Sequence, residues 1–254
     1  MLLFNMKKIL ITGSLGLVGS EAVNFFNSKG WEVFGIDNNM REKLFLYNNG
    51  SISEMSEDIR DEKFVDDLFK TNKFDAIIHT AGQPSHDYSK DHVLEDFDIN
   101  ARGTLILLEA TRKYCPEAVF VFCSTDKVYG GNMNVNITSS TNRIRPLVKL
   151  DEKKEYLDLD DPETLKVANG FDETLGLDFV GCRSLFGCSK TAADIYVQEY
   201  GNYFGMKTVC FRLGCITGRR HKGAELHGFL AYLVKCIKEE KPYKIFGFKG
   251  KQVR

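Results

Sequence analysis

Three glycines, at positions 13, 16 and 19, lie between an apolar run and an amphipathic segment. This spacing is typical of a strand that turns tightly into a helix. Gly13 would allow the tight bend, Gly16 would let the backbone approach a pyrophosphate, and Gly19 would allow close packing of the helix that begins there. Because the amino-terminal end of a helix attracts anions, the pattern predicts a dinucleotide-binding site.

A second apolar run, residues 30–37, ends in a carboxylate at Asp37. A carboxylate at this place accepts hydrogen bonds from ribose hydroxyls and repels a 2′-phosphate. Asp37 therefore favours NAD over NADP, and Arg41 nearby keeps NADP open as the alternative. A glycine-rich turn without a ligand is the other interpretation, but the adjoining strand, helix and carboxylate favour the dinucleotide site.

The composition excludes several classes of protein. Charged residues make up 27% of the 254 residues and the formal net charge is -1, so no overall field favours nucleic acid or an anionic membrane. Seven cysteines lack the short paired spacings of a zinc site or a disulfide framework, which favours a reducing cytoplasm. No stretch approaches the ~20 apolar residues that cross a bilayer. His221 and His227 have no companion ligands, so we expect no metal.

Strands alternate with helical patterns along the chain, which predicts a doubly wound parallel α/β sheet of the Rossmann type. The expected strands are 9–12, 30–37, 74–79, 118–123 and 208–213, and the expected helices are 19–26, 62–70, 93–114, 186–204 and 226–239. Residues 132–180 break this rhythm and predict a long excursion over the edge of the sheet. We expect a NAD-binding domain over 1–180 that includes this excursion. Residues 181–254 would hold the rest of the core and the start of a substrate-binding domain.

Polar residues follow the strand at 118–123, in the order Ser124, Thr125, Asp126 and Lys127. Doubly wound sheets bind their ligands at the carboxyl ends of the strands. We therefore expect these side chains to lie beside the dinucleotide site.

The whole chain resembles the extended short-chain dehydrogenases/reductases, the group of NAD-dependent nucleotide-sugar epimerases and dehydratases. The resemblance rests on the segments 12–19, 58–60, 81–83, 124–130 and 187–190, together with Asn100. Further tracts resemble the CDP-tyvelose (CDP-paratose) 2-epimerase subfamily, at 169–174, 177–179, 187–194, 218–220 and 250–254.

The resemblance implies partners as well as a fold. It implies NAD as cofactor, a nucleotide sugar as substrate with a CDP-sugar favoured, and a role in making surface-polysaccharide sugars. It also implies a homodimer in which the helices at 93–114 and 190–204 pair across a twofold axis. The family's small substrate-binding domain normally continues past the sequence of residues 250–254, so the C-terminal part here is expected to be incomplete.

The resemblance also implies individual roles. Thr125 would bond the sugar hydroxyl that is oxidised, and Lys190 would bond the nicotinamide ribose and supply positive charge. The implied cofactor contacts are Gly13, Gly16, Leu17, Val18, Gly19, Asp37, Asn38, Asp58, Ile59, Ala81, Gly82, Asn100, Ser124 and Lys190. The implied substrate contacts are Gln83, Ser124, Thr125, Phe186, Arg220 and Arg254.

Position 186 is phenylalanine where the family has its catalytic tyrosine. A phenyl ring cannot exchange a proton, and loss of a general base typically slows a reaction by a factor of about 100–10,000. Asp126 or Lys127 would then be the replacement, with Tyr129 and Cys188 as further candidates. Alternatively, hydride transfer continues at a reduced rate, or the chain binds its ligands without catalysis.

The sequence therefore predicts a NAD-dependent nucleotide-sugar epimerase, similar to a CDP-sugar 2-epimerase, that transiently oxidises and re-reduces a sugar carbon. A nucleotide-sugar 4,6-dehydratase and a catalytically silent NAD-binding protein are the alternatives.

Overall fold

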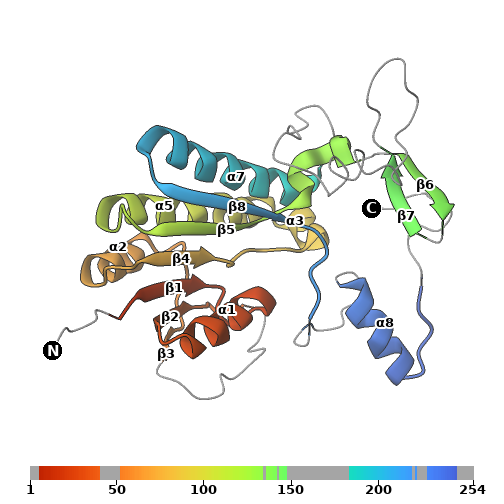
Figure 1. The fold of residues 1–254 in the computed structure, drawn as a ribbon, viewed down its shortest axis with the longest axis horizontal. Helices are drawn as coiled ribbons and strands as arrows, with labels where there is room; N and C mark the ends of the chain where they lie inside the picture. The colour runs from red at the N-terminus through yellow and green to blue at the C-terminus, as the bar shows by residue number, and fades with distance from the viewer. Residues whose placement is uncertain are drawn as a thin grey trace.

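Six parallel strands form one sheet in the order β3-β2-β1-β4-β5-β8 (Figure 1). The computed structural model describes residues 6–40, 52–133, 136–141, 143–147, 183–218, 221 and 228–244. The strands are β1 Lys8–Thr12, β2 Glu32–Ile36, β3 Ile52–Met55, β4 Ala76–His79, β5 Val119–Thr125 and β8 Lys207–Leu213. The strand order reverses between β1 and β4, as in doubly wound sheets. The predicted Rossmann-like α/β fold is confirmed.

Helices lie on both faces of the sheet. One face carries α1 (Leu17–Ser28), and the other carries α2 (Glu62–Thr71), α5 (Gly103–Tyr114) and α7 (Ser184–Phe204) (Figure 1). Alternate strand residues enter two separate cores: Ile9 and Ile11 pack with the α1 side, while Leu10 packs with the α2–α5–α7 side. Because both faces of the central strands are buried, the middle residues of these strands are apolar.

The register brings several strand ends to one edge of the sheet. Thr12 at the end of β1 pairs with Ile36 of β2 and with His79 of β4. On the far side, Thr125 at the end of β5 pairs with Leu213 of β8. Residues that follow these strands therefore meet at the carboxyl edge, where such sheets bind ligands.

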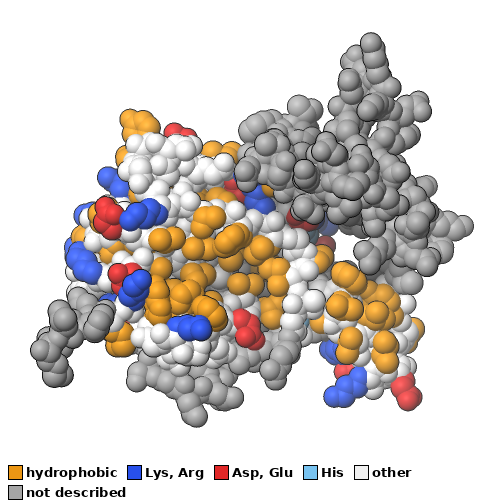
Figure 2. All heavy atoms as spheres, in the orientation of Figure 1, with side chains coloured by type: hydrophobic (Ala, Val, Ile, Leu, Met, Phe, Trp, Pro, Cys, Tyr) orange, Lys and Arg blue, Asp and Glu red, His pale blue; other side chains and the backbone are white. Residues whose placement is uncertain are grey.

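The face of the sheet opposite α7 is partly open at β5 and β8. Val119 is 41% exposed and Phe211 is 51% exposed. Apolar side chains gather at the front of the molecule in Figure 2, over the sheet. The alternation is preserved, because Phe120 and Phe122, which point to the α7 side, are fully buried.

Several element boundaries differ from the predictions. Helix α1 begins at Leu17, two residues before Gly19, and α7 begins at Ser184 rather than 186. Strand β3 was not predicted, because an edge strand with the sequence Ile-Ser-Glu-Met shows no apolar run. Helix α3 (His86–Asp91) was also not predicted; it is short, and Ser85 caps it by accepting a hydrogen bond from the backbone N–H of Tyr88.

The predicted helix 93–114 has three parts that follow one another directly. They are α4 (Val93–Phe97), the π-helical segment η1 (Asp98–Arg102) and α5. A π-helical turn inside a longer helix shifts the direction of the side chains that follow, and such turns are frequent at functional sites. Here the turn carries Asn100, one of the predicted cofactor contacts.

The predicted excursion at 132–180 contains regular structure where it is described. The 3-10 helical segment η2 (Asp126–Met133) follows β5, and β6 (Asn136–Thr141) pairs antiparallel with β7 (Arg143–Leu147). The acidic run at 158–161 lies outside the described residues. Helix α8 (Phe229–Lys238) falls within the predicted helix 226–239. The domain boundaries stay a prediction.

No helix in the described part of the chain combines the length and apolar character that a bilayer span requires.

Candidate cofactor and active site

The connection from β1 into α1 requires glycine at two positions, one in the turn and one in the first turn of the helix. Gly13 has φ +67°, and a Cβ there would lie 2.7 Å from the backbone nitrogen of Ala81. The N–H of Gly13 donates to the carbonyl of Ile36 at 2.7 Å, which ties the turn to the end of β2. A Cβ on Gly19 would lie 2.0 Å from the carbonyl oxygen of Gly13. The first turn of α1 is therefore pressed directly onto the glycine loop, as the spacing predicts.

Gly19→Ala is expected to abolish dinucleotide binding. Alanine ordinarily stabilises a helix relative to glycine by about 0.5–1 kcal/mol. Here the added carbon must push α1 from the loop, so the variant should be destabilised by about 1–3 kcal/mol. Calorimetric titration with NAD and a thermal melt would measure both effects.

Gly214→Ala is the matched control, because a Cβ at Gly214 meets nothing within 4 Å. It should bind NAD and melt as the parent protein does. If Gly19→Ala behaved like this control, the close packing of α1 on the loop would not matter for binding.

The amino terminus of α1 is suited to an anion. Its N-cap is Gly16, no side chain caps it, and no acidic residue lies in its first turn. The amides of Leu17 and Val18 at this end have no acceptor within the helix, because the first four N–H groups of any helix lack one. Together with the dipole of α1, these amides fit the pyrophosphate of a dinucleotide.

Asp37 directly follows β2 and is hydrogen-bonded to the glycine loop. Its carboxylate accepts hydrogen bonds from the backbone N–H of Leu15 at 3.1 Å and of Asn39 at 2.9 Å. The side chain is half-buried, so part of it remains available to ribose hydroxyls. This placement fits the predicted ribose contact, which stays a prediction.

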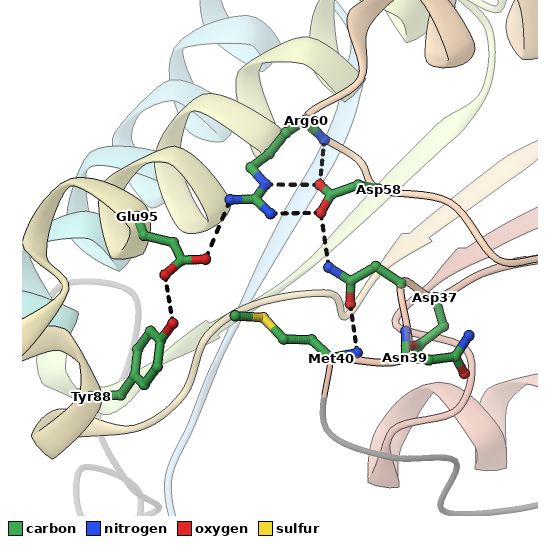
Figure 3. Close-up of polar contacts among 8 residues, drawn as sticks. Asp37, Asn39, Met40, Asp58, Arg60, Tyr88 and Glu95 are labelled. Carbon is green, nitrogen blue, oxygen red and sulfur yellow. Dashed lines mark hydrogen bonds and ion pairs between the residues drawn. The ribbon is translucent and has the colours of Figure 1, made fainter.

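Asp58 lies near Asp37 in a chain of polar contacts (Figure 3). It accepts two side-chain hydrogen bonds from Arg60, at 2.9 and 2.8 Å, and one from Asn38 at 2.8 Å. Although partial burial opposes its ionisation, the hydrogen bonds from Arg60 and Asn38 lower the pKa of Asp58 to about 2. The side chain of Ile59 is buried against α5, so an adenine contact from Ile59 would use its backbone.

A directional hydrogen-bond chain lies beneath the glycine loop. The N–H of Ala81 donates to Thr12 Oγ1, and His79 lies between Thr12 Oγ1 at 2.7 Å and Thr104 Oγ1 at 2.9 Å. Thr104 donates onward to the carbonyl of Asn100 at 2.6 Å, so it must accept from His79 Nε2–H. His79 therefore carries a proton on Nε2, and burial, which lowers its pKa to about 3, favours the neutral ring.

The loop after β4 is held by a buried carboxylate that sequence reasoning missed. Asp96 accepts from the side-chain amide of Gln83 at 2.7 Å and from Ser189 Oγ at 2.5 Å. The side-chain oxygen of Asn100 accepts from the backbone N–H of Gln83 at 2.9 Å. A Cβ on Gly82 would lie 3.0 Å from this same Asn100 Oδ1. The amide groups of Gln83 and Asn100 are thus used in fixing this loop, and their predicted ligand contacts stay predictions.

A second buried carboxylate fixes the end of β5. Asp194 is fully buried and accepts from Ser124 Oγ at 2.5 Å, from Gln198 at 2.6 Å and from two nitrogens of Arg212 at 3.1 and 2.8 Å. These hydrogen bonds connect α7 with β5 and β8. Ser124 is therefore bound to Asp194, and this contact sets the position of the residue that follows it.

Thr125, Asp126 and Lys127 form a compact polar group at the carboxyl end of β5. Thr125 Oγ1 donates to Asp126 at 3.1 Å and accepts from the N–H of Lys127 at 3.3 Å. The ammonium of Lys127 lies 3.1 Å from both carboxylate oxygens of Asp126. Asp126 and Lys127, the two favoured replacements for the tyrosine, are thus each other's counter-ion.

Lys190 projects from α7 to the same edge of the sheet. Its ammonium donates to the carbonyl of Cys123 at 2.8 Å, and lies 4.0 Å from the centroid of the Phe122 ring. A Cβ on Gly82 would lie 3.9 Å from Lys190 Nζ, so the lysine faces the loop that follows β4. Burial lowers the pKa of Lys190 to about 8.

The ring at position 186 is buried at the start of α7. Of the other candidates for proton transfer, Tyr129 is only 6% exposed and its hydroxyl accepts from Arg212 at 3.3 Å. Cys188 is exposed, two residues along the helix from Phe186 and so on a different side. The structure thus gives Tyr129 a packing position and places Cys188 away from the Phe186 ring.

Arg220, Arg254 and His227 lie outside the described residues. His221 Nδ1 lies 3.4 Å from Thr217 Oγ1. Among the described side chains, no three His, Cys, Asp or Glu residues lie together in a way that could hold a metal ion.

Sequence reasoning missed residues that position the site: the buried Asp96, Asp194 and His79, and the partly buried Arg212. The available signal was a carboxylate within an otherwise apolar helical face, since a buried carboxylate must have partners. Asp194 is the last residue of the family-like segment 187–194. Nothing in that segment indicates that Arg212 is its partner.

The cradle of Gly13 and Gly19, the uncapped start of α1 and the carboxylate of Asp37 together define a Rossmann protein of the NAD-binding class. The chain belongs to the NAD dependent epimerase/dehydratase family, whose model matches residues 9–159 and 161–254. The resemblance stated from the sequence is confirmed, as are the enzyme class and NAD as its cofactor.

Named relatives agree with this family. The chain is 34% identical to CDP-paratose 2-epimerase of Salmonella typhi over 97% of its own length and 70% of the relative. It is 26% identical to a putative UDP-glucose 4-epimerase of Methanocaldococcus jannaschii, over 97% of the chain and 68% of the relative. The crystal structure of Thermus thermophilus UDP-glucose 4-epimerase with NAD superposes with a TM-score of 0.71 at 25% identity, covering 94% of this chain and 65% of that one. The chain thus spans about two thirds of the length of these relatives.

Proposed function

We propose that this protein is a nucleotide-sugar epimerase that acts on a CDP-sugar by oxidising one sugar carbon and then reducing it again. One observation carries the proposal: Thr125 and Lys190 lie at the same sheet edge as the NAD cradle. The similarity to CDP-paratose 2-epimerase over 97% of the chain supports the CDP-sugar. NAD would supply the chemistry of accepting and returning a hydride.

The residues of this chain would divide the remaining work. Thr125 would orient the reacting hydroxyl of the sugar through its Oγ1. Asp126, which accepts a hydrogen bond from Thr125 Oγ1, would keep the hydroxyl of Thr125 polarised. Lys190 would bond the nicotinamide ribose, and its positive charge would favour the loss of a proton at the sugar oxygen. The buried networks around Asp96 and Asp194 would hold both groups in place.

Turnover of CDP-paratose, CDP-tyvelose and UDP-glucose in heavy water, followed by NMR, tests the proposed function. A change in configuration at one sugar carbon, without deuterium at C5, is the expected result. Incorporation of deuterium at C5 would instead identify a 4,6-dehydratase, a candidate that the Asp126–Thr125 contact favours because an acid beside the threonine serves that reaction. Absence of turnover for every nucleotide sugar would contradict both enzymes and leave a silent binding protein.

A homodimer through α4 and α7 accompanies this proposal. Exposed apolar or aromatic side chains lie on these helices, with Leu94 81% exposed, Phe97 50%, Tyr196 46% and Tyr203 76%. A surface of this kind is typical of an interface. Sedimentation at micromolar concentration is expected to give the mass of two chains, and Tyr203→Asp is expected to give one. A single-chain mass for the parent protein would contradict the dimer.

The proposed compartment is the cytoplasm. All six cysteines in the described part of the chain are free thiols, and a chain with this many unpaired cysteines suits a reducing environment.

A further inference from the structure

The side chain that contacts Phe186 is an ionisable one. His86, the first residue of α3, lies edge-to-face against the Phe186 ring with 5.0 Å between the ring centroids and an interplanar angle of 76°. The two residues are one hundred positions apart in the sequence. Position 186 therefore lacks the hydroxyl of the family tyrosine, and the imidazole of His86 lies in contact with the phenyl ring found there.

The position of His86 is fixed from both of the helices that meet there. His86 Nδ1 lies 2.8 Å from Ser184 Oγ, and the N–H of Phe186 donates to Ser89 Oγ at 3.2 Å. Ser184 has φ +68°, a left-handed conformation that is uncommon for a residue other than glycine. Strained residues of this kind are concentrated at functional sites. The start of α7 thus adopts a strained conformation in which Ser184 holds the imidazole.

His86 follows the loop that leaves the carboxyl end of β4. That loop carries Gly82, and a Cβ on Gly82 would lie 3.9 Å from Lys190 Nζ. Phe186, which His86 contacts, lies four residues before Lys190 on α7. His86 is an exposed residue, whereas His79 is fully buried.

We propose that His86 exchanges the proton of the reacting sugar hydroxyl in place of the missing tyrosine, an assignment that rests on the proposed function. Bound NAD would supply the hydride acceptor for the oxidation and the hydride source for the reduction. His86 Nε2 would accept the proton of the sugar hydroxyl as that carbon becomes a carbonyl. His86 would give the same proton back to the oxygen when the other face of the carbon is reduced, so that the imidazole ends in the state in which it began.

The other candidates are less suited to this exchange. Both carboxylate oxygens of Asp126 already accept from the ammonium of Lys127, and one of them also accepts from Thr125. Lys127, as an ammonium, has no lone pair to accept a proton. Tyr129 is buried beside Arg212 and Cys188 lies on another side of α7. An imidazole ordinarily changes protonation near neutral pH, which suits a group that must both accept and donate.

His86→Gln tests the assignment against His92→Gln. His92 follows the same short helix and its side chain is 52% exposed, but it stacks on Tyr88 rather than on Phe186. We expect His86→Gln to lower kcat for the CDP-sugar by about 100–10,000-fold, with little change in KM. NAD affinity and the melting temperature should stay at parental values, and His92→Gln should remain fully active.

Rescue by tyrosine distinguishes proton exchange from a structural role. Adding Phe186→Tyr to His86→Gln supplies the hydroxyl of the family and should restore kcat at least tenfold, a gain that a merely structural histidine would not give. Near-parental kcat for His86→Gln, or a loss that Phe186→Tyr fails to restore in a variant that still binds NAD, would overturn the role of His86. Absence of turnover in the parent protein would overturn the proposed function itself, and with it this role.

Discussion

Replacing Asp194 with asparagine is expected to lower the free energy of unfolding by about 3–5 kcal/mol. Four donors point at the two oxygens of this buried carboxylate, two from Arg212 and one each from Ser124 and Gln198. Whichever oxygen becomes an NH2 group then faces two donors, and the partly buried guanidinium of Arg212 loses its counter-ion. Urea denaturation monitored by circular dichroism measures the loss.

Asp66→Asn is the matched control for that experiment. Asp66 also has several partners, Lys70, Lys113 and Tyr114, but its side chain is 33% exposed. Because exposed ion pairs contribute little to stability, this variant should unfold at nearly the parental urea concentration. If Asp194→Asn unfolded with the control, the buried network would not be what holds α7 to β5 and β8.

Lys190→Met is expected to reduce turnover by about 100-fold or more, because it removes a charged donor beside the reacting groups. The stability of the variant at neutral pH should nevertheless equal or exceed that of the parent. Burial of the ammonium lowers the pKa of Lys190 from 10.5 to about 8, a displacement that corresponds to about 3 kcal/mol. Methionine fills a similar volume without a charge, although it loses the hydrogen bond to the Cys123 carbonyl.

The pH dependence of this effect has a definite sign. Below pH 8 the lysine is charged in both folded and unfolded chains, so the whole desolvation penalty is present. Between about 8 and 10.5 the unfolded chain holds a proton that the folded chain has released, so the contribution of Lys190 to stability rises with pH. Denaturation of parent and Lys190→Met across this window should show the rise only in the parent. A parallel pH dependence for the two proteins would contradict a strained, buried ammonium.

The sequence predicted those parts of the fold that local patterns encode. Apolar runs located β1, β2, β4, β5 and β8, and the glycine spacing located the loop whose close packing the structure shows at Gly13 and Gly19. Strand β3 was not predicted, because it has no apolar run of its own. It is held by its backbone pairing with β2, which no local sequence rule encodes. The π-helical turn at 98–102 likewise depends on the packing around Asn100.

The candidate site was predictable in its residue types and less so in its contacts. Thr125 and Lys190 were located by resemblance, and Phe186 was recognised as a departure. The contact between His86 and Phe186 could not be read from the sequence, because it joins residues one hundred positions apart through the packing of α3 on α7. The same holds for the bond between Asp194 and Arg212, which requires β8 to lie beside β5.

Native mass spectrometry of the purified protein, followed by denaturation and identification of the released small molecules, tests the central claim most directly. Release of NAD together with a CDP-sugar is the expected result, and it would supply the compound for the turnover experiments with the His86 and Phe186 variants. Failure to retain any nucleotide, even after NAD is added, would contradict the dinucleotide site formed by Gly13, Gly16, Gly19 and Asp37.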